Sequence, residues 1–134
     1  MRTFRKLLGW GLSLLYVAFI CYLTLFMRHI GTERITKGLF WEYKNFMWHD
    51  IGMNILLFIP LGILLGFALS RNTWKVIAFG FALSLAIELT QYILILGYCE
   101  ADDVLNNTIG TMFGYFVRVG ICKIKRFSHM EAGE

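Results

Sequence analysis

The sequence predicts an all-α, polytopic membrane protein with four transmembrane helices, and three observations support that fold class. First, 57% of the 134 residues are hydrophobic and the mean hydropathy is +0.61, which is too apolar for a soluble domain of this size. Second, four apolar runs have about the 20 residues that a helix needs to cross a bilayer. Third, basic residues gather at the ends of these runs, as they do where positive charge sets membrane topology.

We expect the four spans to follow one another within a single domain that covers residues 1–134. The first run follows a basic stretch but lacks a small-residue cleavage site, so it is expected to be an uncleaved span rather than a signal peptide. The basic tail after Lys123 is expected to be irregular. The expected spans are residues 7–27, 51–69, 76–98 and 104–122.

The basic residues also predict that both termini lie in the cytoplasm. With four spans, nine of the 13 Lys and Arg residues share the side of the termini and four share the other side, and cytoplasmic loops carry the larger number. Although the net charge is +4, the bases sit in short clusters at span ends, which is not the basic face that nucleic acid requires. The nine residues are Arg2, Arg5, Lys6, Arg71, Lys75, Arg118, Lys123, Lys125 and Arg126.

The loop between the first two spans, residues 28–50, is rich in aromatic side chains. Trp and Tyr favour the membrane–water interface, where an apolar ring and a polar group are both accommodated. The loop is therefore expected to lie in the outer interface, and simple anchoring is the alternative to a functional role. Its aromatic residues are Phe40, Trp41, Tyr43, Phe46 and Trp48.

Polar residues inside the spans predict a site in the outer leaflet. Glu88 lies near the middle of the third span, where a lone acid costs roughly 2.5 to 3.5 kcal/mol on insertion scales and should face the bundle interior. A rise of about 1.5 Å per residue places it roughly 15 Å below the outer surface. Three helices are expected to direct polar groups into one pocket, with Glu100 and His49 at its mouth. The candidate site residues are Asp50, Asn54, Glu88, Gln91, Asp102, Asp103 and Asn107.

A second set of residues is expected to shape the helices rather than to bind a ligand. Pro60 removes one backbone hydrogen bond and frees the carbonyl of Leu56. Two pairs of glycines have the GxxxG spacing that lets helices approach closely. These glycines are Gly62 and Gly66 in the second span, and Gly110 and Gly114 in the fourth.

Alternative explanations remain open for most of the polar residues. Asp102 or Asp103 can cap the N-terminus of the fourth helix, a role that needs no ligand. The side-chain amides of Asn54, Gln91 and Asn107 can form interhelical hydrogen bonds. The acids at positions 100, 102 and 103 offer oxygen ligands for Mg²⁺ or Ca²⁺ but match no EF-hand spacing. We find no zinc-binding pair of histidines, glycine-rich phosphate loop or catalytic triad in the sequence. No metal, cofactor or catalytic residue is predicted.

Three motifs resemble those of the VanZ-like membrane proteins. They are HDIGMNILLFIPLG at residues 49–62, IELTQ at residues 87–91 and CEADDVLNNTIGTMFG at residues 99–114. The family pattern pairs an Asn-x-x-x-Phe-x-Pro-Leu-Gly span with Glu-x-x-Gln and with an Asp-Asp-x-x-x-Asn-x-x-Gly helix start. Its polar positions fall on the candidate site residues and on Pro60 and Gly110.

The resemblance implies a role in lowering sensitivity to teicoplanin, a glycopeptide antibiotic with a lipid tail. Membrane lipid, a lipoglycopeptide or a lipid-linked wall precursor is the implied partner, at a bacterial cell membrane. Two mechanisms remain open: non-catalytic binding at the outer pocket, and an enzyme that modifies an envelope lipid or wall precursor. A small proton-coupled transporter is a third possibility, because a mid-membrane Glu can carry protons. The sequence does not give the oligomeric state.

Overall fold

A computed structural model describes residues 2–27, 30–31, 35–69 and 72–131, and within these ranges the side chains of residues 2, 5 and 125–131 lie outside the description. The predicted cytoplasmic or outer placement of Arg28, Arg34 and Arg71 therefore falls outside the described residues. The elements in chain order are α1 (Arg2–Cys21), the π-helical turn η1 (Tyr22–Phe26), β1 (Ile35–Lys37), α2 (Trp41–Lys44), α3 (Trp48–Ala68), α4 (Thr73–Leu94), β2 (Tyr98–Glu100) and α5 (Ala101–Glu131).

The chain is mostly helical, and in its described part three helices are long and apolar enough to cross a membrane: Lys6–Phe26, Trp48–Ala68 and Thr73–Leu94. They correspond to the first three predicted spans. α5 covers the fourth predicted span but is not among them, and Asn106, Asn107 and Arg118 are the strongly polar residues within that stretch. The expectation of an irregular tail after Lys123 was wrong, since α5 continues to Glu131.

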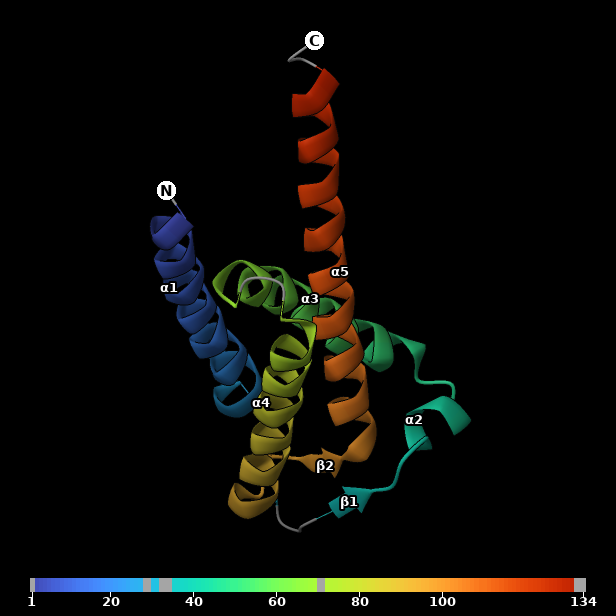
Figure 1. The fold of residues 1–134 in the computed structure, drawn as a ribbon. Coiled ribbons are helices and arrows are strands. Elements are labelled where there is room, and N and C mark those ends of the chain that lie inside the picture. Colours follow the sequence, from blue (N-terminus) through green and yellow to red (C-terminus); the bar gives the residue numbers. More distant parts are fainter. Residues whose placement is uncertain (1, 28–29, 32–34, 70–71, 132–134) are drawn as a thin grey trace.

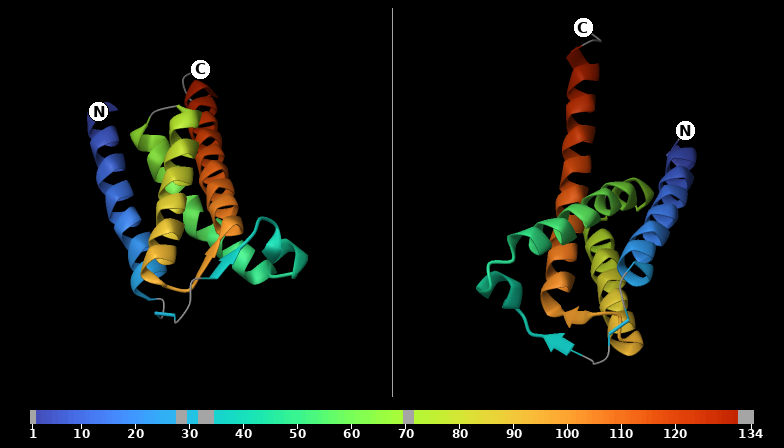
Figure 2. Two further views of the ribbon diagram at one scale, coloured as in Figure 1. Left: turned by 90° about the horizontal axis from the view of Figure 1, so that it is seen from below. Right: turned by 180° about the vertical axis from the view of Figure 1, so that it is seen from behind.

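The helices form a bundle in which α3 crosses α5 obliquely (Figures 1 and 2). The start of α1 and the end of α5 lie at one end of the bundle, and the two strands lie at the other (Figure 1). The most extensive contact joins α3 and α5, while α1 packs on α3 and α4 packs on α5. The core between them consists of Ile20, Phe58, Leu61, Leu65, Val76, Ile87 and Tyr115.

Backbone contact between α3 and α5 requires residues without a side chain. A β-carbon on Gly114 would overlap the carbonyl oxygen of Ile59, and one on Gly110 would overlap another backbone oxygen of α3. From the opposite helix, a β-carbon on Gly62 would overlap a backbone oxygen of α5. The two helices therefore meet backbone to backbone, which is the arrangement that small residues permit.

The other two residues expected to shape the helices, Gly66 and Pro60, make different contacts from these three glycines. A β-carbon on Gly66 would lie 3.2 Å from a side-chain carbon of Arg118, so a side chain rather than backbone approaches it. Pro60 lies inside α3, and the hydroxyl of Tyr16 donates a 2.9 Å hydrogen bond to the carbonyl of Leu57, one turn earlier. α1 thus supplies a donor to the stretch of α3 that precedes the proline.

The two short strands correct the all-α prediction. β1 pairs with β2 in parallel, with Thr36 opposite Cys99 and Lys37 opposite Glu100. The β1–α2 segment, defined here as residues 35–47, is therefore joined through β2 to the ends of α4 and α5. The sequence did not indicate this pairing, because each strand has only three residues and shows no recognisable alternation.

We expect Gly114→Ala to lower the free energy of unfolding by about 1 to 3 kcal/mol or more, because the new methyl group must push α3 and α5 apart. Reversible unfolding in detergent micelles, followed by helical circular dichroism, measures this change. Gly120→Ala is the matched control on the same helix, since a β-carbon there meets nothing within 4 Å and alanine favours helix by roughly 0.5 to 1 kcal/mol. Equal stability of the Gly114 variant and wild type would contradict the tight contact.

Candidate functional site

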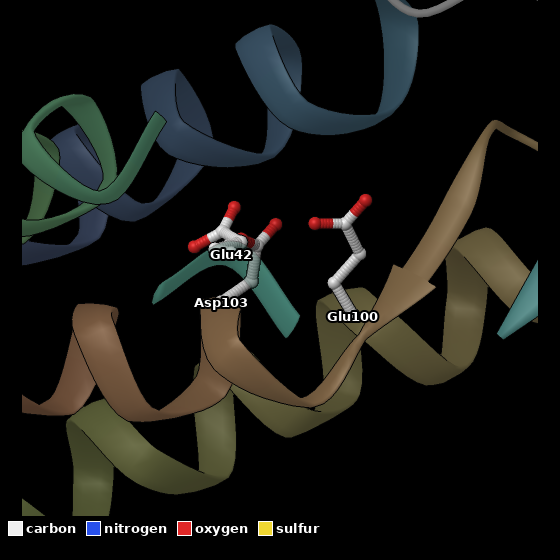
Figure 3. Close-up of side chains that lie close together, drawn as sticks. All are labelled: Glu42, Glu100 and Asp103. Atoms are coloured by element: carbon white, nitrogen blue, oxygen red, sulfur yellow. The ribbon is translucent and has the colours of Figure 1, made fainter. Parts of the chain in front are cut away.

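Three carboxylates from three different elements point into one space at the strand end of the bundle. Glu42 comes from α2, Glu100 from β2 and Asp103 from α5 (Figure 3). Their exposed fractions are 1%, 9% and 5% respectively, and one oxygen of each lies within 4.8 Å of the others. We call these three residues the carboxylate cluster. Carboxyl groups this close and this buried cannot all be ionised unless a positive charge compensates them, and otherwise at least one of them binds a proton.

Burial and neighbouring carboxyl groups raise the pKa of Glu42 well above its ordinary value. Burial raises its pKa first, the negative charges of Asp103 and Glu100 raise it further, and a side-chain hydrogen bond with Glu100 adds to the effect. The result is a pKa of about 8, against an ordinary value of 4.5. At neutral pH Glu42 is therefore mostly a neutral carboxylic acid, a state that carboxyl groups also adopt in some enzyme active sites.

Lys37 supplies the positive charge beside the carboxylate cluster. Its Nζ lies 2.7 Å from Oε1 of Glu100, and it also lies over two aromatic rings, 3.7 Å from the centre of Trp41 and 3.9 Å from the centre of Tyr98. An ammonium group held by a carboxylate and two ring faces gains both ion-pair and cation–π energy. This set of contacts joins β1 to α2 and β2.

α5 attaches the β1–α2 segment through two residues one helical turn apart. The carboxylate of Asp102 accepts hydrogen bonds from the backbone N–H groups of Phe40 and Glu42. Asn106 accepts a hydrogen bond from the hydroxyl of Tyr43 and donates one of 2.8 Å to the Glu42 carboxyl. Because Phe40 has a left-handed backbone conformation with φ of 63°, the Asp102 contacts fix a turn that few residues adopt unaided.

The carboxylate cluster forms part of the wall of a pocket of about 450 Å³. This volume falls within the range typical of small-molecule sites. The β1–α2 segment forms one wall of the pocket, and α3, β2 and α5 form the rest. The lining residues are Lys37, Glu42, Met47, His49, Asp50, Met53, Asn54, Tyr98, Glu100 and Asp103.

Three of the seven candidate residues line this pocket. Asn54 of α3 donates a hydrogen bond to Oδ1 of Asp103, so the two helices present an amide and a carboxylate together. Asp50 lies farther out, with its side chain about half exposed, and its Oδ1 is 3.3 Å from Nδ1 of His49. The residues predicted from the second and fourth spans thus meet at the pocket.

The other four candidate residues lie outside the pocket lining and contact neighbouring elements. Asp102 holds the β1–α2 segment, as described above. Glu88 of α4 accepts a 2.8 Å hydrogen bond from the backbone N–H of Glu100, which positions β2. Asn107 donates to the hydroxyl of Ser84 at 2.8 Å.

Gln91 lies one turn beyond Glu88 on α4 and contacts the first helix. Its amide donates a 2.8 Å hydrogen bond to the carbonyl of Thr24 in η1, which joins α4 to the end of the first membrane-spanning helix. The side-chain oxygens of Gln91 and Asn107 have no hydrogen-bond partner among the described residues.

Glu42 and Lys37 are the site residues that the sequence analysis missed. Both lie in the loop that was interpreted only as an aromatic segment, and the contacts of Lys37 and Glu42 with Glu100 cross 63 and 58 positions of sequence respectively. One clue was available in the sequence, where Glu42 lies between Trp41 and Tyr43. If such an aromatic segment is buried, its acid needs a partner.

The spacing of the carboxylate cluster also raises the question of a metal. Oxygens within 4.8 Å of one another can in general share a hard cation such as Ca²⁺ or Mg²⁺. Here Lys37 is paired with Glu100 and Asn106 donates a hydrogen bond to the Glu42 carboxyl, so groups of the protein already engage two of the three carboxyl groups. We assign no metal ligands among these residues.

Comparisons with known proteins agree with the motifs. The family model described as VanZ/LLP1 matches residues 13–124, a range that contains every residue of the pocket lining. Among curated proteins, Protein VanZ of Enterococcus faecium is 30% identical over 120 residues, which cover 81% of this chain and 72% of that protein. No solved structure matches the chain significantly. The extent of the family match shows that this chain is a member of the VanZ-like family.

Proposed function

We propose that the chain is a four-span membrane protein in which α5 is the fourth span and both termini are cytoplasmic. α5 directs its buried polar residues toward α3 and α4, while Met112, Phe113 and Phe116 are exposed on it. Exposed large apolar side chains on a bundle helix are suited to contact with lipid. The excess of basic residues at the end that holds the start of α1 and the end of α5 supports the orientation. In this orientation the pocket faces outward.

We further propose that the protein lowers sensitivity to lipid-tailed glycopeptides of the teicoplanin type by non-catalytic binding at this pocket. The observation that carries the proposal is the pocket of about 450 Å³ with charged walls, bordered by exposed apolar residues on the β1–α2 segment and at the start of α3. These residues are Leu39, Phe40, Phe46 and Trp48. A polar group of the ligand would enter the pocket while its lipid tail stays in the adjacent outer leaflet.

The pocket is too small for a whole glycopeptide, so it would engage one polar substituent of a ligand held mainly by the membrane. A lipid-linked wall precursor, which also joins a polar head to a lipid, is the other ligand of this kind. In both cases the protein would compete for ligand at the membrane surface rather than transform it.

We expect expression in an isogenic, sensitive host to raise the inhibitory concentration of teicoplanin but not that of vancomycin, which has no lipid tail. Asp103→Asn should abolish the rise, because the uncharged amide changes the pocket at the point where α3 and α5 meet. Lys75→Gln is the matched control, since it removes a charge at an exposed position at the other end of α4. Membrane abundance of all variants is measured by immunoblot.

Equal protection against both drugs would reject binding through the lipid tail. Full protection by the Asp103→Asn variant at wild-type abundance would reject this pocket as the site.

A second candidate function is favoured by the protonation of Glu42. A carboxylic acid that stays neutral near pH 7 beside ionised carboxylates has the properties of a general acid. In this case the protein would be an enzyme that acts on an envelope lipid or wall precursor, with Glu42 donating a proton and Asp103 available as a base.

Catalysis by this pair would change the chemical composition of the envelope. We expect mass spectrometry of lipids and muropeptides to reveal a new species in cells that express wild type, and that species should be absent with Glu42→Gln. Identical profiles in cells with and without the protein would reject the enzymatic function and leave the binding function in place.

A further inference from the structure

The β1–α2 segment is attached to the rest of the protein mainly through ionisable or carboxylate-dependent contacts. Asp102 accepts from two of its backbone N–H groups, Lys37 pairs with Glu100, and the Glu42 carboxyl receives a hydrogen bond from Asn106. Apart from the short β1–β2 ladder, the contact of Lys37 with the Tyr98 ring and the backbone hydrogen bonds at the junction with α3, the described polar contacts that hold this segment involve Asp102, Asn106 or the carboxylate cluster. Its attachment should therefore respond to the charge of these groups.

Glu42 is the group on this segment whose charge is least compatible with the closed arrangement. Glu100 and Asp103 face it from β2 and α5 within 4.8 Å, and Asp102 and Tyr43 also lie close enough to interact with its charge. Lys37 is engaged with Glu100, and Glu88 of α4 reaches the backbone of Glu100 from the other side. On α3, Asp50 and His49 line the same pocket.

We propose that the β1–α2 segment is a proton-controlled lid over the pocket, closed while Glu42 is protonated and released when Glu42 ionises. An ionised Glu42 would be a buried anion between other anions, and moving the segment outward is the way for it to reach water. Lys37, Glu42 and Met47 would leave the pocket wall with it, and Asp103 and Asn54 would become more accessible. As a way of controlling ligand access, the lid rests on the proposed function of the pocket.

The direction of the pH dependence follows from the two protonation equilibria. The closed form binds the proton on Glu42 with a pKa of about 8, whereas an open, hydrated Glu42 has an ordinary pKa of about 4.5. Opening therefore releases a proton between these two values, and the equilibrium constant for opening increases by up to about tenfold per pH unit. Below the lower value both forms are protonated, and above the higher value both are ionised, so the constant levels off.

Amide hydrogen exchange of the purified protein measures this opening even when the open form is rare. The N–H groups of Phe40 and Glu42 are bonded to Asp102 in the closed form, so a peptide that covers residues 38–46 reports on the lid. Rates are corrected for the intrinsic pH dependence of exchange, and the protein is held in zwitterionic lipid nanodiscs with a chelator, so that only protons titrate the cluster. Peptides from α4 and α5 report on the fold as a whole.

For wild type we expect the opening constant of this peptide to rise by roughly 50-fold between pH 6 and pH 8 and to level off above pH 8. Glu42→Gln keeps the shape and the hydrogen bond from Asn106 but cannot ionise, so its opening constant should not vary with pH. Asp50→Asn removes a carboxylate from the same pocket at a half-exposed position and should retain the wild-type profile.

An opening constant for wild type that does not vary with pH would overturn the proposal. So would a wild-type pH profile in the Glu42→Gln variant with α4 and α5 still protected. Because no antibiotic or lipid substrate takes part in the measurement, these outcomes are independent of whether the pocket has the proposed function.

Discussion

The backbone contact between α3 and α5 determines where the polar residues of this protein can lie. Gly62, Gly110 and Gly114 leave no side chain between the helices, so the two axes come close together. In both helices these glycines follow the pocket residues in the sequence. Asn54 then reaches Asp103 directly. If a methyl group separated the helices, this hydrogen bond would be among the first to lengthen, and with it the wall that α3 and α5 share.

The N-terminal turns of α5 use two adjacent faces for two different purposes. Asp103 and Asn107 are one turn apart and contact α3 and α4, which secures the bundle. Asp102 and Asn106 are also one turn apart and contact α2, which secures the β1–α2 segment. Consecutive acids therefore serve neighbouring faces because each position advances about 100° around the helix. The arrangement concentrates negative charge, and Lys37 and the proton on Glu42 compensate it.

The apolar helices arise from local sequence and were predicted, whereas the strand pairing and the burial of Glu42 arise from distant residues and were not. Long apolar runs identified three helices that are long and apolar enough to cross a membrane, because length and composition are local properties, and the order of the motifs identified the family. The β1–β2 pairing and the burial of Glu42 depend on residues about 60 positions apart. No periodicity in residues 35–47 indicates such contacts. Gln91 was predicted to join the other polar groups in the pocket, but it is not among the lining residues, and its amide donates to the carbonyl of Thr24 in η1, a contact with a distant residue that no motif indicates.

The central claim is that the β1–α2 segment folds onto β2 and α5 and thereby completes the pocket. The most direct measurement is a crosslink between β1 and β2 in native membranes. Thr36 lies opposite the native Cys99 in the parallel pair, and adjacent strands are about 4.8 Å apart, within the Cα range of disulfides. In a protein with Cys21 and Cys122 replaced by Ser, Thr36→Cys should form an intramolecular disulfide on mild oxidation, and the additional change Cys99→Ser should abolish it. Thiols that stay reduced, or that form only intermolecular dimers, would contradict the account.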